Sequence, residues 1–575
     1  MKNARTMVAV AMLAGLTGGL GAVPARAQDT VSAERLNTAD KDAKDWLIYR
    51  GSYRNYNYSA LNQINSKNVK NLHVAWLHTP GRSKWGLQGM PLAVDGVLYY
   101  SGSYSRVFAL DGATGEVKWF FFPELDEALI AKQTHSPMNR GIAISHGKVY
   151  VGTIDGRLIA IDMKTGKKVW DTKLINSQKL TVGFSGAPLA VKNMVIIGSQ
   201  GGEWPVNGSI FAVDADSGKK VWEFNPISDD PKARATWGHD SWKVGGGGAW
   251  QPGTYDPSTN TVWWGTSNPA PLFDWGQDWR TEGSRPGENL YTSSVLALDA
   301  DTGKLKFHHQ EIPHDNWDFD SATGEFIMLD RGGKKLVVHP NKSGYVFVYN
   351  RDDASLFNVW RATENSNFVQ DIDPHTGELK GRTSHALGDN KNICPAFTGA
   401  IGWPPGSYNP KTGLYYRAVA EACMNLKVAK TTPVVQPQAQ LFIGAQFTVV
   451  GPNGQKPWGH VDARDPLTGK LKFSVKYQAP IVAATLSTGG NLLFVPDAAG
   501  WLHAYDATSG KELWKHNNGS SHNGGIMSYE AHGKQYVAVV SGCCSLSSFG
   551  NQFTYGLPYA AQSTDQGELV VFAVR

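Results

Sequence analysis

The chain contains few cysteines and few charged residues, and each shortage excludes some classes of function. Only four cysteines occur in 575 residues, and charged residues make up 18%. No Cys-x-x-Cys-His motif is present, which excludes covalently attached haem, and no cysteine pair shows the spacing with histidines that zinc sites use. No basic run with interleaved aromatic residues occurs, so we expect no nucleic-acid partner despite the formal net charge of +5.

Long apolar runs are also absent beyond the N-terminus. Lys2 and Arg5 precede a mostly apolar stretch from Val8 to Val23, and Ala25-Arg26-Ala27 fits a signal-peptidase site. A membrane anchor is the alternative, but the run is short and broken by glycine. We therefore expect residues 1–27 to be a cleaved signal peptide, the mature protein to be exported to the periplasm, and no membrane span.

Glycine, tyrosine and tryptophan are abundant, with 63, 21 and 20 residues. A sequence motif of the form Asp-x-x-Thr/Ser-Gly-Lys/Glu-x-x-aromatic, called the repeat phrase below, recurs along the chain. It begins at Asp111, Asp162, Asp214, Asp299, Asp465 and Asp506. Repeats at roughly 40 to 50 residues are typical of solenoids and propellers.

Each phrase predicts a strand, a tight turn and a second strand, because glycine tolerates the positive φ that such turns need. We expect the aromatic residue to pack one repeat on the next, in an all-β propeller that leaves few strand edges open. Residues 28–575 are predicted to form a single domain. A short helix is expected near Ala39–Leu47, and the segments 223–297 and 352–460 are expected to interrupt the repeats.

Chemistry-bearing residues gather around glycine-rich turns in the middle of the chain. Gly245–Gly248 precede Trp250, Asn268 follows Gly265, and Pro313–Asp320 includes two aspartates one residue apart. Upstream, Glu203 follows a Gly-Gly pair. An indole offers a flat apolar face, and carboxylates and a carboxamide offer oxygen ligands for a hard cation. The pattern indicates a seat for a planar, anionic cofactor held through a metal.

These motifs together resemble the pyrroloquinoline-quinone (PQQ) dependent alcohol dehydrogenases, with similarity to methanol and ethanol dehydrogenases over nearly the whole mature chain. The matching motifs are the Trp repeats, Gly-Gly-Glu, Gly-Gly-Gly-x-Trp, Gly-Thr-x-Asn-Pro-Ala-Pro and Pro-His-Asp-x-Trp-Asp. The resemblance implies an eight-bladed propeller with PQQ at the centre of one face.

By match to the family pattern, Glu203, Asn268 and Asp318 bind the metal ion, and Asp318 is the catalytic base. Asp320, two residues after the base, resembles the ligand of the lanthanide-using branch of the family. An extra carboxylate suits a trivalent ion of high coordination number. The resemblance leaves Ca²⁺ and a lanthanide ion both open.

The resemblance also implies the cofactor contacts. Trp250 matches the indole on which PQQ lies, Arg140 matches the arginine that binds its carboxylates, and Lys342 matches a catalytic basic residue beside the quinone oxygens. Smaller contacts are implied at Ser185, Gln200, Gly201 and Gly202. Gln88 stands where many relatives carry glutamate.

Several positions depart from the family. Thr134-His135 replace a vicinal cysteine pair that covers PQQ, so His135 is a candidate lid or substrate contact, with a surface histidine as the alternative. Cys543-Cys544 are either a substitute vicinal disulfide or a pair of thiols, whereas Cys394–Cys423 resembles a structural bridge of the family. Gly402 and Val482 replace larger side chains, which predicts a roomier pocket and a substrate bulkier than methanol.

The expected function is oxidation of a primary or secondary alcohol by a periplasmic PQQ enzyme. Without a haem motif, the electrons must pass to a separate acceptor, and we expect a soluble cytochrome c. The oligomeric state is left open, a homodimer included. Two alternatives keep the propeller without the quinone: a hydrolase and an exported scaffold for protein assembly.

Overall fold

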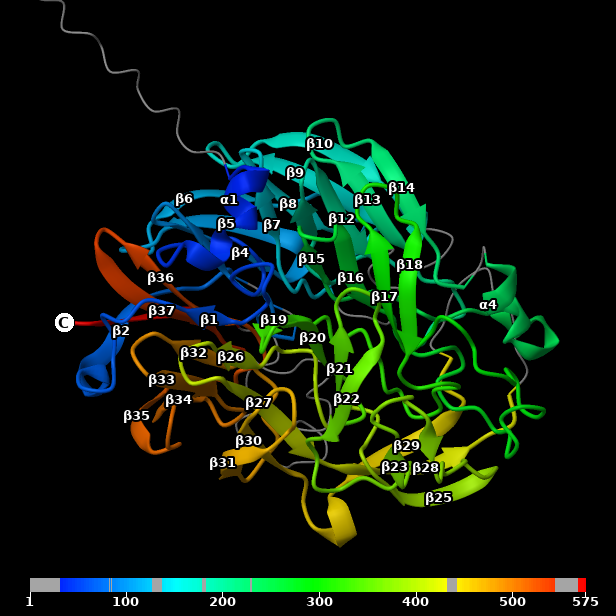
Figure 1. The fold of residues 1–575 in the computed structure, drawn as a ribbon. Helices are drawn as coiled ribbons and strands as arrows, with labels where there is room; N and C mark the ends of the chain where they lie inside the picture. The colour runs from blue at the N-terminus through cyan, green and yellow to red at the C-terminus, as the bar shows by residue number, and fades with distance from the viewer. Residues whose placement is uncertain are drawn as a thin grey trace, which may run out of the picture. The chain divides into compact units, whose positions relative to one another are not determined.

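Antiparallel four-stranded sheets are the repeating unit of the fold (Figure 1). The computed structural model describes residues 31–81, 83, 85–126, 137–177, 182–227, 230–431, 442–542 and 567–575. Within them, eight sheets have four or five strands, and two smaller sheets have two or three. The all-β expectation is confirmed.

Five of these sheets follow the chain strand by strand. Their strands are β3 Leu92–Val94, β4 Val97–Gly102, β5 Arg106–Asp111 and β6 Val117–Phe121; β7 Ala143–Ser145, β8 Lys148–Gly152, β9 Arg157–Asp162 and β10 Lys168–Lys173; β11 Leu189–Val191, β12 Met194–Gly198, β13 Ile210–Asp214 and β14 Lys220–Phe224; β15 Thr254–Asp256, β16 Thr261–Gly265, β17 Ser294–Asp299 and β18 Leu305–Gln310; and β19 Ile327–Arg331, β20 Lys334–Pro340, β21 Tyr345–Asn350 and β22 Leu356–Arg361.

The other three large sheets contain a detour or a distant partner. Their strands are β26 Ser407–Asn409, β27 Leu414–Glu421, β30 Trp458–Arg464 and β31 Leu471–Tyr477; β1 Tyr58–Ser59, β32 Leu486–Thr488, β33 Leu492–Pro496, β34 Trp501–Asp506 and β35 Glu512–Asn517; and β36 Ile526–Ala531, β37 Lys534–Val540, β38 Leu569–Val574 and β2 Leu72–His78.

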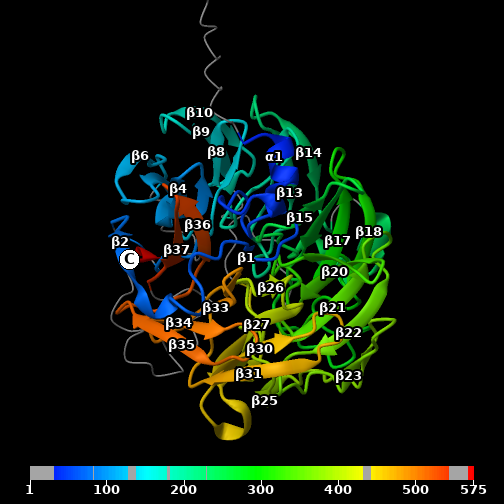
Figure 2. The same cartoon turned by 60° about the vertical axis from the view of Figure 1, so that its left-hand side comes forward.

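The sheets are arranged around a common centre in the order of the chain (Figure 2). The first strands of neighbouring sheets meet there, as β7 and β11 do, and these short strands are buried. The N-terminal strand β2 pairs antiparallel with the C-terminal strand β38, so both ends of the ring share one sheet. The family expectation of a β-propeller is thereby confirmed.

The recurring tryptophans join one sheet to the next, as predicted. The Trp170 indole donates a hydrogen bond to the carbonyl of Ala215 at 3.2 Å. A Cβ on Gly218, at φ +71°, would lie 2.7 Å from that indole, so the turn requires glycine for two reasons. The same indole-to-carbonyl bond joins Trp76 to Gly112, Trp119 to Met163, Trp222 to Ala300 and Trp360 to Pro466.

The pattern fails at the fourth phrase. Phe307 is 37% exposed, and His309, two residues later, lies against Gly377 instead. Gly377 ends a further Asp-x-x-Thr-Gly turn from Asp373, which the repeat search missed because no aromatic residue follows at the usual spacing.

Helices are short and few in the described residues. They are α1 Ala33–Asn37, α4 Pro231–Ala235 and 3₁₀ turns at Ala39–Lys41, Val69–Asn71, Ser103–Ser105, Gly238–Lys243 and Pro452–Gly454. Of the helix expected near Ala39–Leu47, the 3₁₀ turn Ala39–Lys41 is present, and the α-helix α1 lies earlier, capped by the Ser32 hydroxyl. No helix in the described part is long and apolar enough to cross a membrane.

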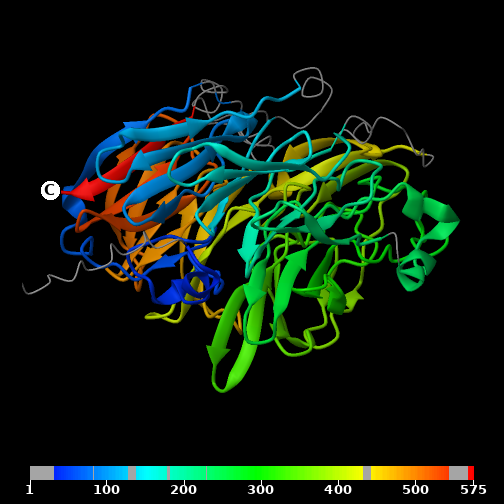
Figure 3. The ribbon, with the colours of Figure 1, turned by 90° about the horizontal axis from the view of Figure 1, so that it is seen from above.

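The two segments expected to interrupt the repeats contain regular strands as well. The first supplies β15 and β16 and carries α4 at the outer side of the sheets (Figures 1 and 3). The second supplies β26 and β27 and two small sheets, made of β23 Asp371–Ile372 and β24 Leu379–Lys380, and of β25 Gly388–Ile393, β28 Cys423–Val428 and β29 Ala445–Val450. Alternation of strand residues was too weak there to predict them.

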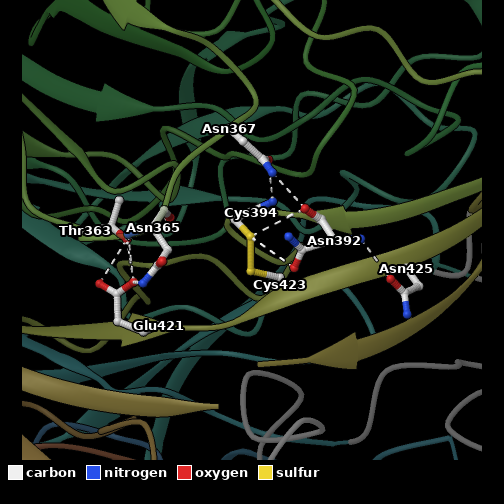
Figure 4. Close-up of a disulfide and its surroundings, with 8 residues drawn as sticks. All are labelled: Thr363, Asn365, Asn367, Asn392, Cys394, Glu421, Cys423 and Asn425. Atoms are coloured by element: carbon white, nitrogen blue, oxygen red, sulfur yellow. Dashed lines mark hydrogen bonds between the residues drawn. A yellow bond between two sulfur atoms is a disulfide. The ribbon is translucent and has the colours of Figure 1, made fainter. Parts of the chain in front are cut away.

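The predicted Cys394–Cys423 disulfide is present and ties β28 to the end of β25 (Figure 4). Beside it, the Glu421 carboxylate accepts hydrogen bonds from the main chain of Glu364 and Asn365 at 2.8 and 3.0 Å. The Thr363 hydroxyl and the Asn365 side-chain amide also donate to it, and His460 Nε2 lies at 3.1 Å. These contacts tie the end of β27 to the segment that follows β22 and to β30.

Antiparallel connection places the predicted site residues at one face. In a sheet of four sequential strands, the loop after the second strand and the loop before the first emerge on the same side. The loops after β12, β16 and β20 hold Glu203, Asn268 and Lys342, whereas the loops before β15 and β19 hold Trp250 and Asp318.

Candidate functional site

Two buried aspartates lie in the loop between β18 and β19. Asp318 and Asp320 are 4% and 2% exposed. Lys342 Nζ lies 2.8 Å from Asp318 Oδ2 and 3.9 Å from Asp320 Oδ1. The other Asp318 oxygen, Oδ1, is buried without a hydrogen-bond partner. Asp318 has φ +70°, a strained conformation for a non-glycine residue that is common at functional sites.

A third aspartate holds this loop in shape. The Asp315 carboxylate accepts hydrogen bonds from the main-chain N–H groups of Trp317 at 3.0 Å and Phe319 at 2.8 Å, and from the Ser293 hydroxyl at 2.7 Å. These bonds flank Asp318 on both sides and set its direction. The role of Asp315 was not predicted from the sequence, although it stands in the same motif. The pattern that could have revealed it is an aspartate whose carboxylate accepts a hydrogen bond from the main-chain N–H two residues later.

Asp320 connects the indole to the neighbouring loop. Trp250 Nε1 donates a hydrogen bond to Asp320 Oδ2 at 2.9 Å, and the Asn268 main-chain N–H approaches Oδ1 at 3.4 Å. The Asn268 side-chain N–H₂ donates to the Gly202 carbonyl at 3.1 Å, which leaves its Oδ1 buried and unpartnered. The predicted residues Trp250, Asn268 and Asp320 are therefore brought together.

The glycine run allows these loops to pack main chain against main chain. A Cβ on Gly248 would lie 2.7 Å from the Gly201 nitrogen, and one on Gly202 would lie 2.4 Å from Asn268 Oδ1. The Gly247 N–H donates to the Asn268 carbonyl at 2.9 Å. Side chains at these positions would push the loops apart, so the glycines bring Glu203, Asn268 and Trp250 to the same place.

Arg140 lies between two indoles. Its guanidinium is 5.0 Å from the rings of both Trp250 and Trp403, and it donates a hydrogen bond to the Ser185 hydroxyl at 2.9 Å. Arg140 Nε has no hydrogen-bond partner, although the side chain is buried. Burial lowers the pKa of Arg140 to about 10, so the group stays cationic near neutral pH.

Two amide side chains near the site are also buried with free polar atoms. Gln88 Oε1 and Gln200 Nε2 have no hydrogen-bond partner. A buried polar atom without a hydrogen bond costs about 1–3 kcal/mol, so such atoms indicate that a bonding partner is missing.

Burial and crowding of carboxylates shift the acids of the site upward. Burial raises the pKa of Asp318 well above its ordinary range, and Lys342 opposes this shift. Burial and the nearby Asp320 raise the pKa of Glu203 to about 7. Burial alone would lower the pKa of Lys342, but Asp318 and Asp320 raise it above its ordinary value. Two acids with raised pKa values beside a lysine are typical of a functional site.

The donor set fits a hard cation and an anionic cofactor. In the described ranges, no three His, Cys, Asp or Glu side chains are already gathered around one point. However, Asn268 Oδ1 is a buried oxygen that lacks any donor, and a cation would satisfy it. The free Nε of Arg140 and Nε2 of Gln200 would satisfy acceptors on the cofactor.

One pocket adjoins Lys342 and contains both small substitutions. It is lined by Gly402 and Val482, together with apolar residues such as Ala418 and Ile481. Its wall includes Gly399, where a Cβ would lie 2.3 Å from Lys342 Cγ. The two family departures thus lie together beside the predicted site.

The family model for the β-propeller domain of PQQ-dependent glucose, ethanol and alcohol dehydrogenases matches residues 46–371 and 453–537. The chain belongs to this family. A quinohemoprotein alcohol dehydrogenase of Comamonas testosteroni is 35% identical over 547 residues, which cover 91% of this chain and 76% of that one. A lanthanide-dependent methanol dehydrogenase of Methylacidiphilum fumariolicum is 30% identical and covers 100% of this chain and 98% of its own length.

Among solved structures, a europium-containing methanol dehydrogenase aligns with a TM-score of 0.84 at 29% identity, covering 94% of this chain and 100% of that one. The chain is thus an enzyme of the quinoprotein alcohol dehydrogenase class. Membership in a dehydrogenase family disfavours the scaffold and hydrolase alternatives.

Some predicted features of this quinoprotein dehydrogenase lie outside the described residues. They are the signal peptide at 1–27, the lid candidates Thr134 and His135, and Cys543-Cys544.

Proposed function

We propose that this dehydrogenase oxidises a primary or secondary alcohol to an aldehyde or ketone, with PQQ as hydride acceptor and Asp318 as the base. The observation that supports the proposal is that the two carboxylate oxygens of Asp318 have different surroundings. Lys342 engages Oδ2 at 2.8 Å, whereas Oδ1 is buried and free to accept a proton. PQQ, when bound, supplies an electrophilic quinone carbon, and its metal ion polarises the adjacent carbonyl.

Asp318 takes the hydroxyl proton of the alcohol at Oδ1. A general base needs to lie within hydrogen-bond reach of that proton and to have a pKa near the working pH. Burial supplies the upward pKa shift, and Asp315 supplies the orientation through the N–H groups on either side. Lys342 keeps Asp318 Oδ2 occupied and lies where it can stabilise negative charge on quinone oxygens.

Glu203, Asn268, Asp318 and Asp320 would hold the metal ion through their oxygens. Their carboxylates give a charge of −3, which suits either Ca²⁺ or a trivalent lanthanide. The presence of Asp320 favours the lanthanide, and the lanthanide and europium named for two relatives point the same way.

Trp250 would support the cofactor and Arg140 would bind its carboxylates, with smaller contacts from Ser185, Gln200, Gly201 and Gly202. Arg140 is already oriented by Ser185 and by two indoles, so it loses little freedom on binding. Gln88 presents an uncharged carboxamide where a glutamate would repel a cofactor carboxylate.

The substrate is bulkier than methanol. Gly402 and Val482 line one pocket beside Lys342, and its other walls are mostly apolar and small. The pocket has a volume of about 20 Å³, so a small alkyl group of the alcohol would bury apolar surface there. Thr134 and His135 are proposed to cover this side of the cofactor, and Cys543-Cys544 to form a vicinal disulfide nearby.

The remaining assignments concern the whole molecule. We take the eight large sheets as eight blades of one domain, 28–575, after removal of the signal peptide 1–27 and export to the periplasm. The chain carries no haem-attachment motif, so electrons leave to a soluble cytochrome c. The oligomeric state stays open, a homodimer included.

Reconstitution tests the proposal. Purified protein is loaded with PQQ and with Ca²⁺ or La³⁺, its visible absorption is recorded, and dye-coupled oxidation is measured for methanol, ethanol and secondary alcohols. Stoichiometric PQQ uptake with alcohol-dependent turnover is expected. Protein that binds no PQQ, or that turns over no alcohol when loaded, would contradict the assignment.

A further inference from the structure

The indole of Trp250 and the carboxylate of Asp320 are joined directly. Trp250 Nε1 donates to Asp320 Oδ2 at 2.9 Å, although the residues are 70 apart in the chain. An indole has one donor, and here it is aimed at an acid rather than at the main-chain carbonyls that the blade tryptophans use. The predicted cofactor shelf and the predicted extra metal ligand are thus in contact.

The bond holds Asp320 back from a closer contact with Lys342. Lys342 Nζ lies 3.9 Å from Asp320 Oδ1, beyond hydrogen-bond range, but 2.8 Å from Asp318 Oδ2. In a buried site the attraction between an ammonium and a carboxylate is strong, so an untethered Asp320 side chain would rotate toward Lys342. The indole N–H on Oδ2 and the Asn268 N–H near Oδ1 oppose that rotation.

We propose that Trp250 is a positioning residue for the metal site: its N–H holds the Asp320 carboxylate in the orientation that binds the cation. This role rests on the proposed function, and it adds to the stacking role that the family implies. A ligand held in place loses less side-chain entropy when the ion binds. Because Trp250 and Asp320 are hydrogen-bonded, PQQ binding at Trp250 and metal binding at Asp320 strengthen one another. By thermodynamic linkage this coupling is the same in both directions.

The substitution Trp250→Phe tests the proposal, since it keeps an aromatic face and removes the donor. Ca²⁺ and La³⁺ are titrated into each variant by isothermal titration calorimetry at saturating PQQ. Loss of one hydrogen bond to a charged group predicts that the Kd for La³⁺ rises by at least about fivefold. The matched control is Trp170→Phe, which removes an indole bond to a carbonyl far from the site and should change the Kd by less than about twofold.

A double-mutant cycle with Asp320→Asn separates positioning from general damage. Without the Asp320 charge to position, Trp250→Phe should change the metal Kd by less than about twofold. An equal effect of Trp250→Phe on both backgrounds would overturn the proposal, as would a change below twofold in the parent background.

A second measurement does not depend on PQQ or metal. In cofactor-free protein labelled with ¹⁵N-tryptophan, the Trp250 indole resonance, identified by its loss in Trp250→Phe, should move upfield in Asp320→Ala. An unchanged resonance would show that Trp250 does not donate a hydrogen bond to Asp320. A parent protein that binds neither PQQ nor metal would instead contradict the proposed function. If the parent binds both and Trp250→Phe leaves the metal Kd unchanged, only the positioning role is contradicted.

Discussion

Asp214 lies in a blade turn on one face of the propeller, and Asp318 lies in a loop on the opposite face. Asp214 Oδ1 accepts hydrogen bonds from the Ser217 N–H and hydroxyl, both at 2.7 Å, and from the Asp216 N–H at 3.2 Å. The Ser217 hydroxyl chiefly lowers the pKa of Asp214. Burial raises that of Asp318, whose Oδ1 has no partner. Satisfied oxygens make the first aspartate structural, and an unsatisfied one makes the second chemically available.

The largest expected effect is on Asp318. Asp318→Asn should lower kcat by about 10³-fold, because the base is lost while the carboxamide keeps the size of the side chain. Asparagine also tolerates the φ of +70° at this position, so the fold should be retained. The measurement is dye-coupled turnover at full PQQ and metal occupancy. A rate within tenfold of the parent would show that Asp318 is not the base.

Asp315 tests whether orientation of the loop matters. Asp315→Ala leaves two N–H groups and a hydroxyl without their acceptor, which should lower the free energy of unfolding by about 2–4 kcal/mol. The displaced loop should lower kcat by about 10²-fold. Urea unfolding and steady-state kinetics measure both. Asp315→Asn keeps an acceptor oxygen and should fall between the parent and Asp315→Ala; an unchanged kcat in Asp315→Ala would remove the positioning role.

The blade turns should affect stability alone. Trp170→Ala removes an indole that covers Gly218 and should lower the free energy of unfolding by about 2 kcal/mol. Because this contact is on the far face from Asp318, kcat/KM should not change. A loss of activity without a loss of stability would show that the two faces are coupled.

His460 gives a pH dependence of stability outside the site. Burial would lower its pKa, but Asp462 and Glu421 raise it to about 9 from an ordinary 6.5. A raised folded-state pKa adds stability that is complete below the unfolded value and lost as pH rises toward 9, on the order of 2 kcal/mol. The parent should therefore lose more stability than His460→Gln between pH 6.5 and 9 in urea unfolding. Parallel curves for the two proteins would contradict this.

The smallest expected change concerns substrate choice. Val482→Trp should fill the pocket and raise KM for a branched secondary alcohol by about tenfold, while KM for ethanol changes by less than about twofold. The ratio of kcat/KM for the two alcohols measures it. An equal loss for both alcohols would place the substrate elsewhere.

The blade turns were predictable because their rules are local. An aspartate, two residues, then Thr-Gly specifies the turn by hydrogen bonds within five residues, and the indole packing follows from repetition. The rule failed at Phe307, where the contact passes to His309, because the turn that receives it, from Asp373, lies in the irregular segment and not at the usual spacing. Helix α1 was not predicted, because its cap is a single serine and its stability depends on tertiary packing.

The site was predictable only in part. Family motifs named Asp318, Asn268, Trp250 and Lys342, and the structure brings them together. No local pattern reveals that Trp250 donates to Asp320 or that Lys342 prefers Asp318, because these contacts join separate loops. Asp315 was overlooked because its partners are main-chain N–H groups, whose direction depends on a backbone that sequence does not display.

A single anaerobic turnover tests the central claim most directly. Protein loaded one-to-one with PQQ and metal is mixed with a secondary alcohol, and the absorption of the oxidised cofactor is followed in a stopped-flow spectrometer. The account predicts rapid, stoichiometric reduction in the parent and reduction at least about 10²-fold slower in Asp318→Asn at equal occupancy. Equal rates in the two proteins would contradict it.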